Sequence, residues 1–203
     1  MSQGVFITFE GPDGAGKSTH ARRLAAWLKG RGRRVLLTRE PGGTPLGDRI
    51  RALLLHSKPG SMDAVTELML YEASRSLLVR QVLRPALRQG KVVILDRFQD
   101  STWVYQGWAG GMDLKLVEKI GQAAAGGLAP RLTLLLDLPA RKGLARVRRP
   151  NRMEKKPAAF HEKVRRGFLV LARRQPRRFW VIRADRPLAE VQRAVREVVS
   201  RVL

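Results

Sequence analysis

A glycine-rich stretch near the start of the chain has the spacing of a phosphate-binding loop. Residues 11–19 read GPDGAGKST and match the pattern G-x-x-x-x-G-K-[ST]. Glycines let backbone N–H groups approach a polyanion, and the helix that follows directs its positive end to the same place. We expect Lys17 to reach the β- and γ-phosphates of a nucleoside triphosphate and Ser18 to bind Mg²⁺. The residues predicted to hold this donor are Gly11, Pro12, Asp13, Gly14, Ala15, Gly16, Lys17, Ser18 and Thr19.

Two carboxylates accompany this loop. Asp13 lies inside it, where a negative charge does not help to bind phosphate. Asp96 ends the apolar stretch KVVILD, and ligands of parallel sheets bind at the carboxyl ends of the strands. We therefore expect Asp96 to be directed at Mg²⁺, either directly or through water. The alternative for Asp96 is a capping or salt-bridging role beside Arg97.

Arginines indicate the class of reaction. The segments TREPGG (38–43), EASR (72–75) and LDRF (95–98) each place an arginine after a predicted strand or on a helix that faces the crevice. Several cations near a bound triphosphate suit a second anion beside it. The sequence has no N-K-x-D motif of the kind that reads guanine in GTPases. A compact chain with these features favours a nucleotide kinase.

Apolar stretches alternate with helical patterns along the chain. The predicted strands cover residues 5–10, 34–38, 91–96, 131–138 and 178–184. Continuous apolar strands separated by helices indicate a parallel sheet that is covered on both faces. We expect an α/β fold of the three-layer P-loop NTPase type, with a five-stranded parallel sheet in a single domain over 1–203.

Three further segments have distinct patterns. Residues 62–89 are predicted as a long helix that Pro85 kinks near its end. A closing helix begins at Pro187, with an apolar stripe formed by Leu188, Val191, Val195, Val198 and Val202. The segment RVRRPNRMEKKP (146–157) is too polar for a core, and we expect it to form a short mobile flap, or LID.

Composition limits the partners. The 203 residues include no cysteine and no apolar run near the roughly 18 residues of a membrane span, and the start lacks the pattern of a signal peptide. We therefore expect a cytoplasmic protein with no membrane partner. Forty Lys and Arg against seventeen Asp and Glu give a net charge of +23. This charge favours polyanions, but we interpret it as a solvated arginine-rich surface and expect no nucleic-acid partner, because no aromatic-interleaved basic motif is present.

Longer stretches make the chain resemble the bacterial thymidylate kinases. These stretches are FITFEGPDGAGKST, TREPGGTPLGDRIR, LMLYEASR, ILDRFQDSTWVYQG and NRME…FHEKV, and they follow the family order from residue 6 to about 165. The resemblance implies phosphorylation of dTMP to dTDP in dTTP biosynthesis. It also implies ATP as the phosphoryl donor, Mg²⁺ as the metal and a homodimer as the assembly.

The resemblance also assigns residues to the acceptor phosphate. Arg51, Arg75 and Arg97 match arginines that hold the phosphate of dTMP. Glu40 and Pro41 match a loop that lines the monophosphate site. Without the family, the sequence favours surface cations as the interpretation of Arg51 and Arg75.

The resemblance also assigns residues to the nucleoside part of dTMP. Tyr71 matches an aromatic residue, commonly Phe, that stacks on thymine, whereas its spacing alone is typical of a core residue. Thr102 and Gln106 match residues that contact the base, and Gln106 alone reads as a plain loop residue. Tyr105 matches a tyrosine that crowds the ribose 2′ position. Asp13 matches an acidic residue that approaches the sugar 3′-hydroxyl and the ligands around magnesium.

Catalysis needs cations more than a base, because the acceptor phosphate is already largely dianionic at neutral pH. Arg97 is placed to bridge donor and acceptor. In one branch of the family an arginine follows the acidic loop residue, where this chain has Gly14; the bacterial pattern takes arginines from the flap instead. The alternative for the flap is a solvated basic turn. The predicted catalytic residues are Lys17, Arg97, Asp13, Arg149 and Arg152.

Two other functions stay open at this point. A related nucleoside monophosphate or deoxynucleoside kinase would share the donor loop. A nucleoside acceptor would need a carboxylate base for its 5′-hydroxyl, and the arginines at 51, 75 and 97 favour a monophosphate instead. A nucleic-acid-binding phosphate-loop protein is the alternative that the charge suggests, and salt-sensitive DNA binding without phosphoryl transfer would identify it.

Overall fold

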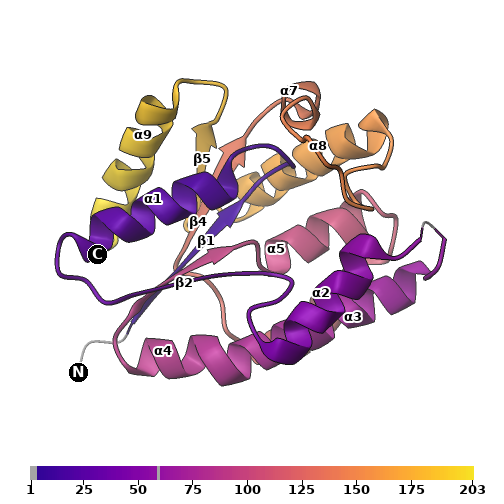
Figure 1. The fold of residues 1–203 in the computed structure, drawn as a ribbon, viewed down its shortest axis with the longest axis horizontal. Coiled ribbons are helices and arrows are strands. Elements are labelled where there is room, and N and C mark those ends of the chain that lie inside the picture. The colour runs from indigo at the N-terminus through magenta and orange to yellow at the C-terminus, as the bar shows by residue number, and fades with distance from the viewer. Residues whose placement is uncertain (1–3, 59) are drawn as a thin grey trace.

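The computed structural model describes residues 4–58 and 60–203. Its central element is a five-stranded sheet in the order β2-β3-β1-β4-β5, with every neighbouring pair parallel (Figure 1). The strands are β1 (Val5–Glu10), β2 (Val35–Arg39), β3 (Val92–Asp96), β4 (Leu132–Asp137) and β5 (Phe179–Arg183). The predicted parallel sheet is confirmed.

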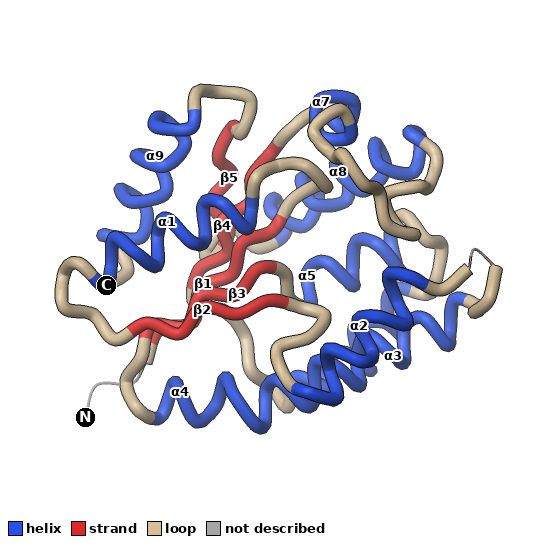
Figure 2. Tube along the Cα trace, viewed as in Figure 1, coloured by secondary structure: helices blue, strands red, loops and turns tan. Residues whose placement is uncertain are grey.

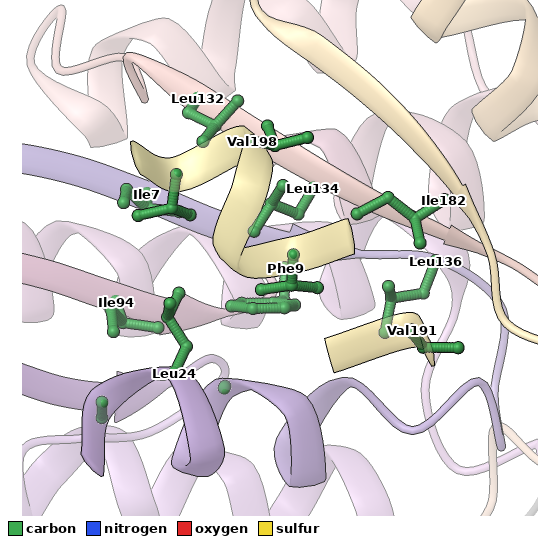
Figure 3. Close-up of a cluster of buried hydrophobic side chains, with 14 of the residues drawn as sticks. Ile7, Phe9, Leu24, Ile94, Leu132, Leu134, Leu136, Ile182, Val191 and Val198 are labelled. Atoms are coloured by element: carbon green, nitrogen blue, oxygen red, sulfur yellow. The ribbon is translucent and has the colours of Figure 1, made fainter. Parts of the chain in front are cut away.

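Successive side chains of each strand point to opposite faces of the sheet, so the core consists of one apolar layer on each face. On one face, side chains such as Ile7, Ile94 and Leu134 pack with Leu24 of α1 (Lys17–Lys29) and Val198 of α9 (Leu188–Ser200) (Figure 3). This apolar layer lets α1 and α9 cover the same side of the sheet, which Figure 1 shows.

The closing helix differs from its prediction at its first residue. Leu188 was expected on the apolar stripe, but it is 41% exposed, and the buried stripe begins at Val191. Leu188 is the first residue of the helix after the cap at Pro187, and the helix first contributes a buried side chain at Val191.

The opposite face carries the remaining large helices (Figure 2). Phe6, Val93 and Leu95 pack there against the end of α3 (Ala64–Leu78) and the segment that follows it. Leu135 packs with Phe168 of α8 (Ala158–Arg174). The other elements are α2 (Pro45–His56), α4 (Arg84–Arg88), α5 (Gln99–Thr102), the π-helical segment η2 (Trp103–Trp108), α6 (Leu114–Ala125) and α7 (Ala140–Leu144).

The predicted long helix over 62–89 is present without interruption from Ala64 to Arg88, in three contiguous parts. After α3, the chain forms one π-helical segment, η1 (Val79–Leu83), before α4 begins. Pro85 lies in the first turn of α4. Proline has no N–H to donate, and its ring excludes the carbonyl four residues earlier. The wider π turn makes room for the proline ring. The irregular part of the helix therefore lies before Pro85 and not after it.

The flap is packed more tightly than its composition predicts. Residues 145–157 form turns without helix or strand. Met153 nevertheless is only 5% exposed and packs with Trp103, Tyr105 and Phe168. The expectation that this segment is too polar for a core is therefore wrong at Met153. No helix among residues 4–58 and 60–203 is long and apolar enough to cross a membrane.

Candidate active site

The carboxyl ends of the central strands open onto one cleft of about 450 Å³. Both the phosphate loop and the predicted acceptor residues line it. The predicted residues on its wall are Asp13, Gly14, Gly16, Lys17, Ser18, Thr19, Glu40, Pro41, Arg51, Tyr71, Arg75, Asp96, Arg97, Thr102, Tyr105 and Gln106. The predicted residues that do not line it are Gly11, Pro12, Ala15, Arg149 and Arg152. Arg39, the arginine of the TREPGG segment, also lines the cleft at the end of β2, although no specific role was predicted for it.

The side chain of Lys17 reaches back into the phosphate loop that precedes it. Its ammonium donates to the carbonyl oxygens of Gly11, at 3.0 Å, and Pro12, at 2.7 Å. Gly16, the residue before the helix, takes a left-handed conformation with φ 86°, which turns the chain from the loop into α1. Burial, together with the neighbouring charge of Arg97, lowers the pKa of Lys17 to about 8. Additional negative charge in the cleft would favour the protonated form.

Gly14 is required by a close approach of two backbone segments. A Cβ built on Gly14 would lie 2.0 Å from the carbonyl oxygen of Gly143 in α7, and φ at Gly14 is +72°. A Cβ on Gly143 would lie 2.2 Å from the carbonyl oxygen of Asp13. No side chain fits at either position without movement. The loop therefore packs directly on the helix from which the flap extends.

Asp13 faces the arginine that follows β3. Arg97 donates through Nη2 to Asp13 Oδ1 at 2.5 Å, and the Tyr105 hydroxyl donates to Asp13 Oδ2 at 2.9 Å. Burial opposes ionisation of Asp13, but the charges of Arg97 and Lys17 outweigh it and lower the pKa of Asp13. Arg97 also donates through Nη1 to the carbonyl of Gly11 at 3.2 Å. Arg97 thus connects the donor loop with the acceptor wall.

Glu10 positions the segment that carries Arg97, a function that motif analysis missed. One carboxylate oxygen of Glu10 accepts from the backbone N–H of Phe98 at 2.7 Å, and the other accepts from the Ser101 hydroxyl at 2.5 Å. Ser101 in turn accepts from Arg97 Nη1 at 3.0 Å. The only signal in the sequence is an acidic residue at the end of a buried strand. Burial, aided by the nearby charge of Asp100, raises the pKa of Glu10 to about 8.

Glu10 should make folding stability depend on pH. Because the pKa of Glu10 rises from 4.5 to about 8 on folding, the folded protein holds a proton that the unfolded chain releases. This contribution is full below the unfolded pKa and is lost as pH rises through the window towards 8. Glu10→Gln is neutral at every pH. Its free energy of unfolding should rise relative to the parent protein by up to about 1.4 kcal/mol per pH unit within this window. Denaturant unfolding at several pH values measures it, and parallel curves would contradict it.

Arg75 is enclosed by its partners. It is 1% exposed and donates to Glu40 Oε2 at 2.8 Å, to Glu72 Oε1 at 2.6 Å and to Thr102 Oγ1 at 2.9 Å. Burial raises the pKa of Glu40 to about 7, against the lowering effect of Arg75. Arg51 donates to the carbonyl of Pro41 at 2.9 Å. Two of the predicted phosphate-binding arginines are therefore held beside the 40–41 loop.

Ser18 and Asp96 meet in the cleft. The Ser18 hydroxyl donates to Asp96 Oδ2, so the two oxygens predicted to face a metal are adjacent. Mg²⁺ prefers oxygen ligands and is usually bound by one or two carboxylates together with substrate phosphates. A hydroxyl and a carboxylate beside a phosphate loop fit that ion.

The flap brings a different arginine to the loop from those predicted. Arg146 lines the cleft and donates to the carbonyl of Gly14 at 3.4 Å. Arg149 is exposed. Arg152 instead donates through Nε to the carbonyl of Leu54 at 2.8 Å and forms an ion pair with Glu67. In this arrangement neither Arg149 nor Arg152 lies on the cleft wall.

His161 is a second residue that motif analysis missed. Its ring is 1% exposed, and Nδ1 lies 3.7 Å from Asp13 Oδ2. Neither ring nitrogen has a hydrogen-bond partner in the described part of the chain. His161 lies in FHEKV, one of the stretches that carry the family resemblance, but the sequence gives it no role and does not link it to Asp13.

Comparison with known proteins agrees with this geometry. The family model described as Thymidylate kinase matches residues 9–195. The thymidylate kinase of Deinococcus radiodurans is 48% identical over 203 residues, covering 98% of each chain, and that of Syntrophotalea carbinolica is 48% identical, covering 92% of this chain and 90% of its own. A crystal structure of thymidylate kinase from Ehrlichia chaffeensis superposes with a TM-score of 0.81 at 33% identity, covering 98% of this chain and 99% of that one. The chain belongs to the thymidylate kinase family.

Proposed function

We propose that the protein transfers the γ-phosphate of ATP to dTMP and so forms dTDP and ADP. The observation that carries this proposal is that one cleft holds the phosphate loop together with Arg51, Arg75 and Arg97. A donor triphosphate and an acceptor monophosphate would otherwise repel each other, and these cations offset the repulsion. The enzyme is then a cytoplasmic kinase of dTTP synthesis, since its nucleotide substrates are found there.

The donor is held by the loop and the acceptor phosphate by the arginines. We assign Lys17 to the β- and γ-phosphates of ATP, and Ser18 and Asp96 to Mg²⁺. Mg²⁺, when bound, neutralises charge on the donor phosphates. Arg97 gives up part of its contact with Asp13 and bridges oxygens of the donor and acceptor phosphates. Holding these oxygens near attack distance is the main contribution of the protein to the rate.

The nucleoside of dTMP lies towards α3 and η2 in this proposal. Tyr71 stacks on the base, while Thr102 and Gln106 approach its edge. Tyr105, fixed by its hydrogen bond to Asp13, crowds the ribose 2′ position. Asp13 is left facing the acceptor sugar and the metal, away from the donor phosphates.

Arg146 should contribute more to turnover than the two flap arginines predicted from sequence. Arg149 and Arg152 reach the donor only if the flap rearranges, and Arg152 must first leave Glu67. We expect Arg146→Ala to lower kcat by about 10- to 100-fold, since it removes one cation from the donor side. Arg149→Ala serves as the matched control and should change kcat less. A larger loss in Arg149→Ala would show that the flap moves during turnover.

An ADP-release assay tests the reaction. ATP and Mg²⁺ are supplied with dTMP, dUMP, CMP, UMP, AMP or GMP, and thymidine is included as a nucleoside acceptor. We expect the highest kcat/KM for dTMP and no turnover of thymidine. Lys17→Ala controls for contaminating kinases. Preference for another monophosphate or for thymidine would replace the proposal with the related kinase alternatives. Salt-sensitive DNA binding without transfer would indicate the nucleic-acid alternative.

Exposed apolar side chains on α2 and α3 support a homodimer. Leu46 and Leu53 on α2 and Val65 and Met69 on α3 are each at least 50% exposed, and these two helices pack side by side. We expect Leu53→Lys combined with Met69→Lys to yield monomers in analytical ultracentrifugation. Leu188→Lys, which changes an exposed leucine on α9, should leave a dimer. A parent protein that sediments as a monomer would contradict the proposal.

A further inference from the structure

A carboxylate on α3 joins the flap to the acceptor end of the cleft. Glu67 is buried in the first turn of α3. Its Oε1 accepts a hydrogen bond from Nε2 of Gln106 at 2.8 Å. Its Oε2 accepts from Nη2 of Arg152 at 2.5 Å. One side chain thus contacts both a residue of the cleft wall and a residue of the flap.

These contacts determine which way the Gln106 amide points. Arg152 donates its N–H to Oε2 of Glu67. An ionised carboxylate has no hydrogen of its own, so Oε1 can only accept a hydrogen bond. The amide nitrogen of Gln106 must therefore face Glu67. The side-chain oxygen Oε1 of Gln106 is the group left for a ligand. This side-chain oxygen accepts no hydrogen bond from residues 4–58 and 60–203. Gln106 lines the cleft.

A fixed acceptor on the wall distinguishes pyrimidine bases. Thymine and uracil carry a hydrogen on N3, which can be donated to a carbonyl oxygen. Cytosine has a lone pair on N3, which would face the lone pairs of that oxygen. Tyr71 lies one helical turn after Glu67, and both Tyr71 and Gln106 line the cleft, so we place the edge of a base stacked on Tyr71 against Gln106.

We propose that Glu67 is a positioning residue for base selection. It holds Gln106 with the carbonyl oxygen towards the base and thereby favours a pyrimidine with a hydrogen on N3. Glu67 itself does not touch the substrate. This inference rests on the proposed function, because it assumes that a pyrimidine monophosphate occupies the cleft.

Arg152 occupies the other carboxylate oxygen of Glu67. Arg152 is tied to the end of α2 through its side chain, which donates to the carbonyl of Leu54 at 2.8 Å, and through its backbone N–H, which donates to the carbonyl of Leu55 at 3.1 Å. The docked flap thus places a cation beside Oε2 of Glu67, while Oε1 remains with Gln106. Arg152 has a structural task here that is separate from any contact with ATP.

The test compares binding of dTMP and dCMP by isothermal titration calorimetry. In Glu67→Gln the new amide can offer either oxygen or nitrogen, so Gln106 is free to turn over. We expect the ratio of the dCMP and dTMP dissociation constants to fall by about tenfold or more, the size of one hydrogen bond of correct polarity. Arg152→Met removes the same ion pair but keeps the carboxylate against Gln106. Its ratio should stay within about threefold of the parent value.

Two results would overturn the proposal. One is a Glu67→Gln protein that folds, as judged by its thermal midpoint, and keeps the parent ratio. The other is an equal fall of the ratio in Arg152→Met, which would assign the effect to loss of the ion pair. If Glu67→Gln does not fold, Gln106→Leu replaces it and must show the reduced ratio; an unchanged ratio there also refutes the proposal. Phosphorylation of dTMP by the parent protein keeps the proposed function intact in every one of these cases.

Discussion

Replacing Arg97 by alanine should lower kcat by about 10³-fold. Arg97 donates to the Gly11 carbonyl on the donor loop and to Asp13 and Tyr105 beside the acceptor wall, so it is the cation shared by both halves of the cleft. Its removal leaves two substrate anions facing each other without a bridge. Steady-state kinetics with ATP and dTMP measure the change.

Two controls separate the charge of Arg97 from its geometry. Arg97→Lys keeps the positive charge but loses the planar fork that reaches several oxygens at once, so it should recover only part of the activity. Arg177→Ala removes an exposed arginine that has no partner in the described part of the chain, and it should retain the parent kcat. A kcat for Arg97→Ala within about tenfold of the parent would contradict a bridging role.

Arg75→Met should have the largest effect on stability. It removes the cation from two buried carboxylates, Glu40 and Glu72, and loss of one partner from a buried ion network costs about 3–5 kcal/mol. Urea unfolding at neutral pH measures the change in the free energy of unfolding. The loss should shrink at acidic pH, because protonated carboxyls no longer need the cation.

A triple variant identifies the source of that loss. Arg75→Met together with Glu40→Gln and Glu72→Gln leaves no uncompensated charge, so it should be more stable than Arg75→Met alone. Equal losses in the two variants would mean that Arg75 stabilises through packing, including its position over the Phe98 ring, and not through charge.

The sequence predicted the strands well because a buried parallel strand must be a continuous apolar run. The run VFITFE corresponds to β1, and KVVILD differs from β3 only by its first residue. Gathering of the motif residues in one cleft could also be predicted, since the carboxyl ends of parallel strands share one edge. Asp96, adjacent to Ser18, is an example.

Features set by contacts between distant segments could not be predicted. Glu10 holds Phe98 and Ser101, which lie 88 and 91 residues later in the chain. The partners of Arg152 lie on α2 and α3, so the polar composition of the flap predicted exposure where the structure has an ion pair. Composition describes what a segment can do in water, whereas these contacts depend on which surface the fold brings beside it.

The contact between Gly14 and Gly143 restricts each of these positions to glycine, whatever residue occupies the other. A side chain at either position meets backbone of the other segment, and a backbone cannot rotate aside as a side chain can. A loop arginine of the kind that another branch of the family carries therefore cannot be introduced into this chain by one substitution at position 14. The helix α7 would first have to recede, and the root of the flap would move with it. Grafts between branches should exchange the loop, α7 and the flap as one block.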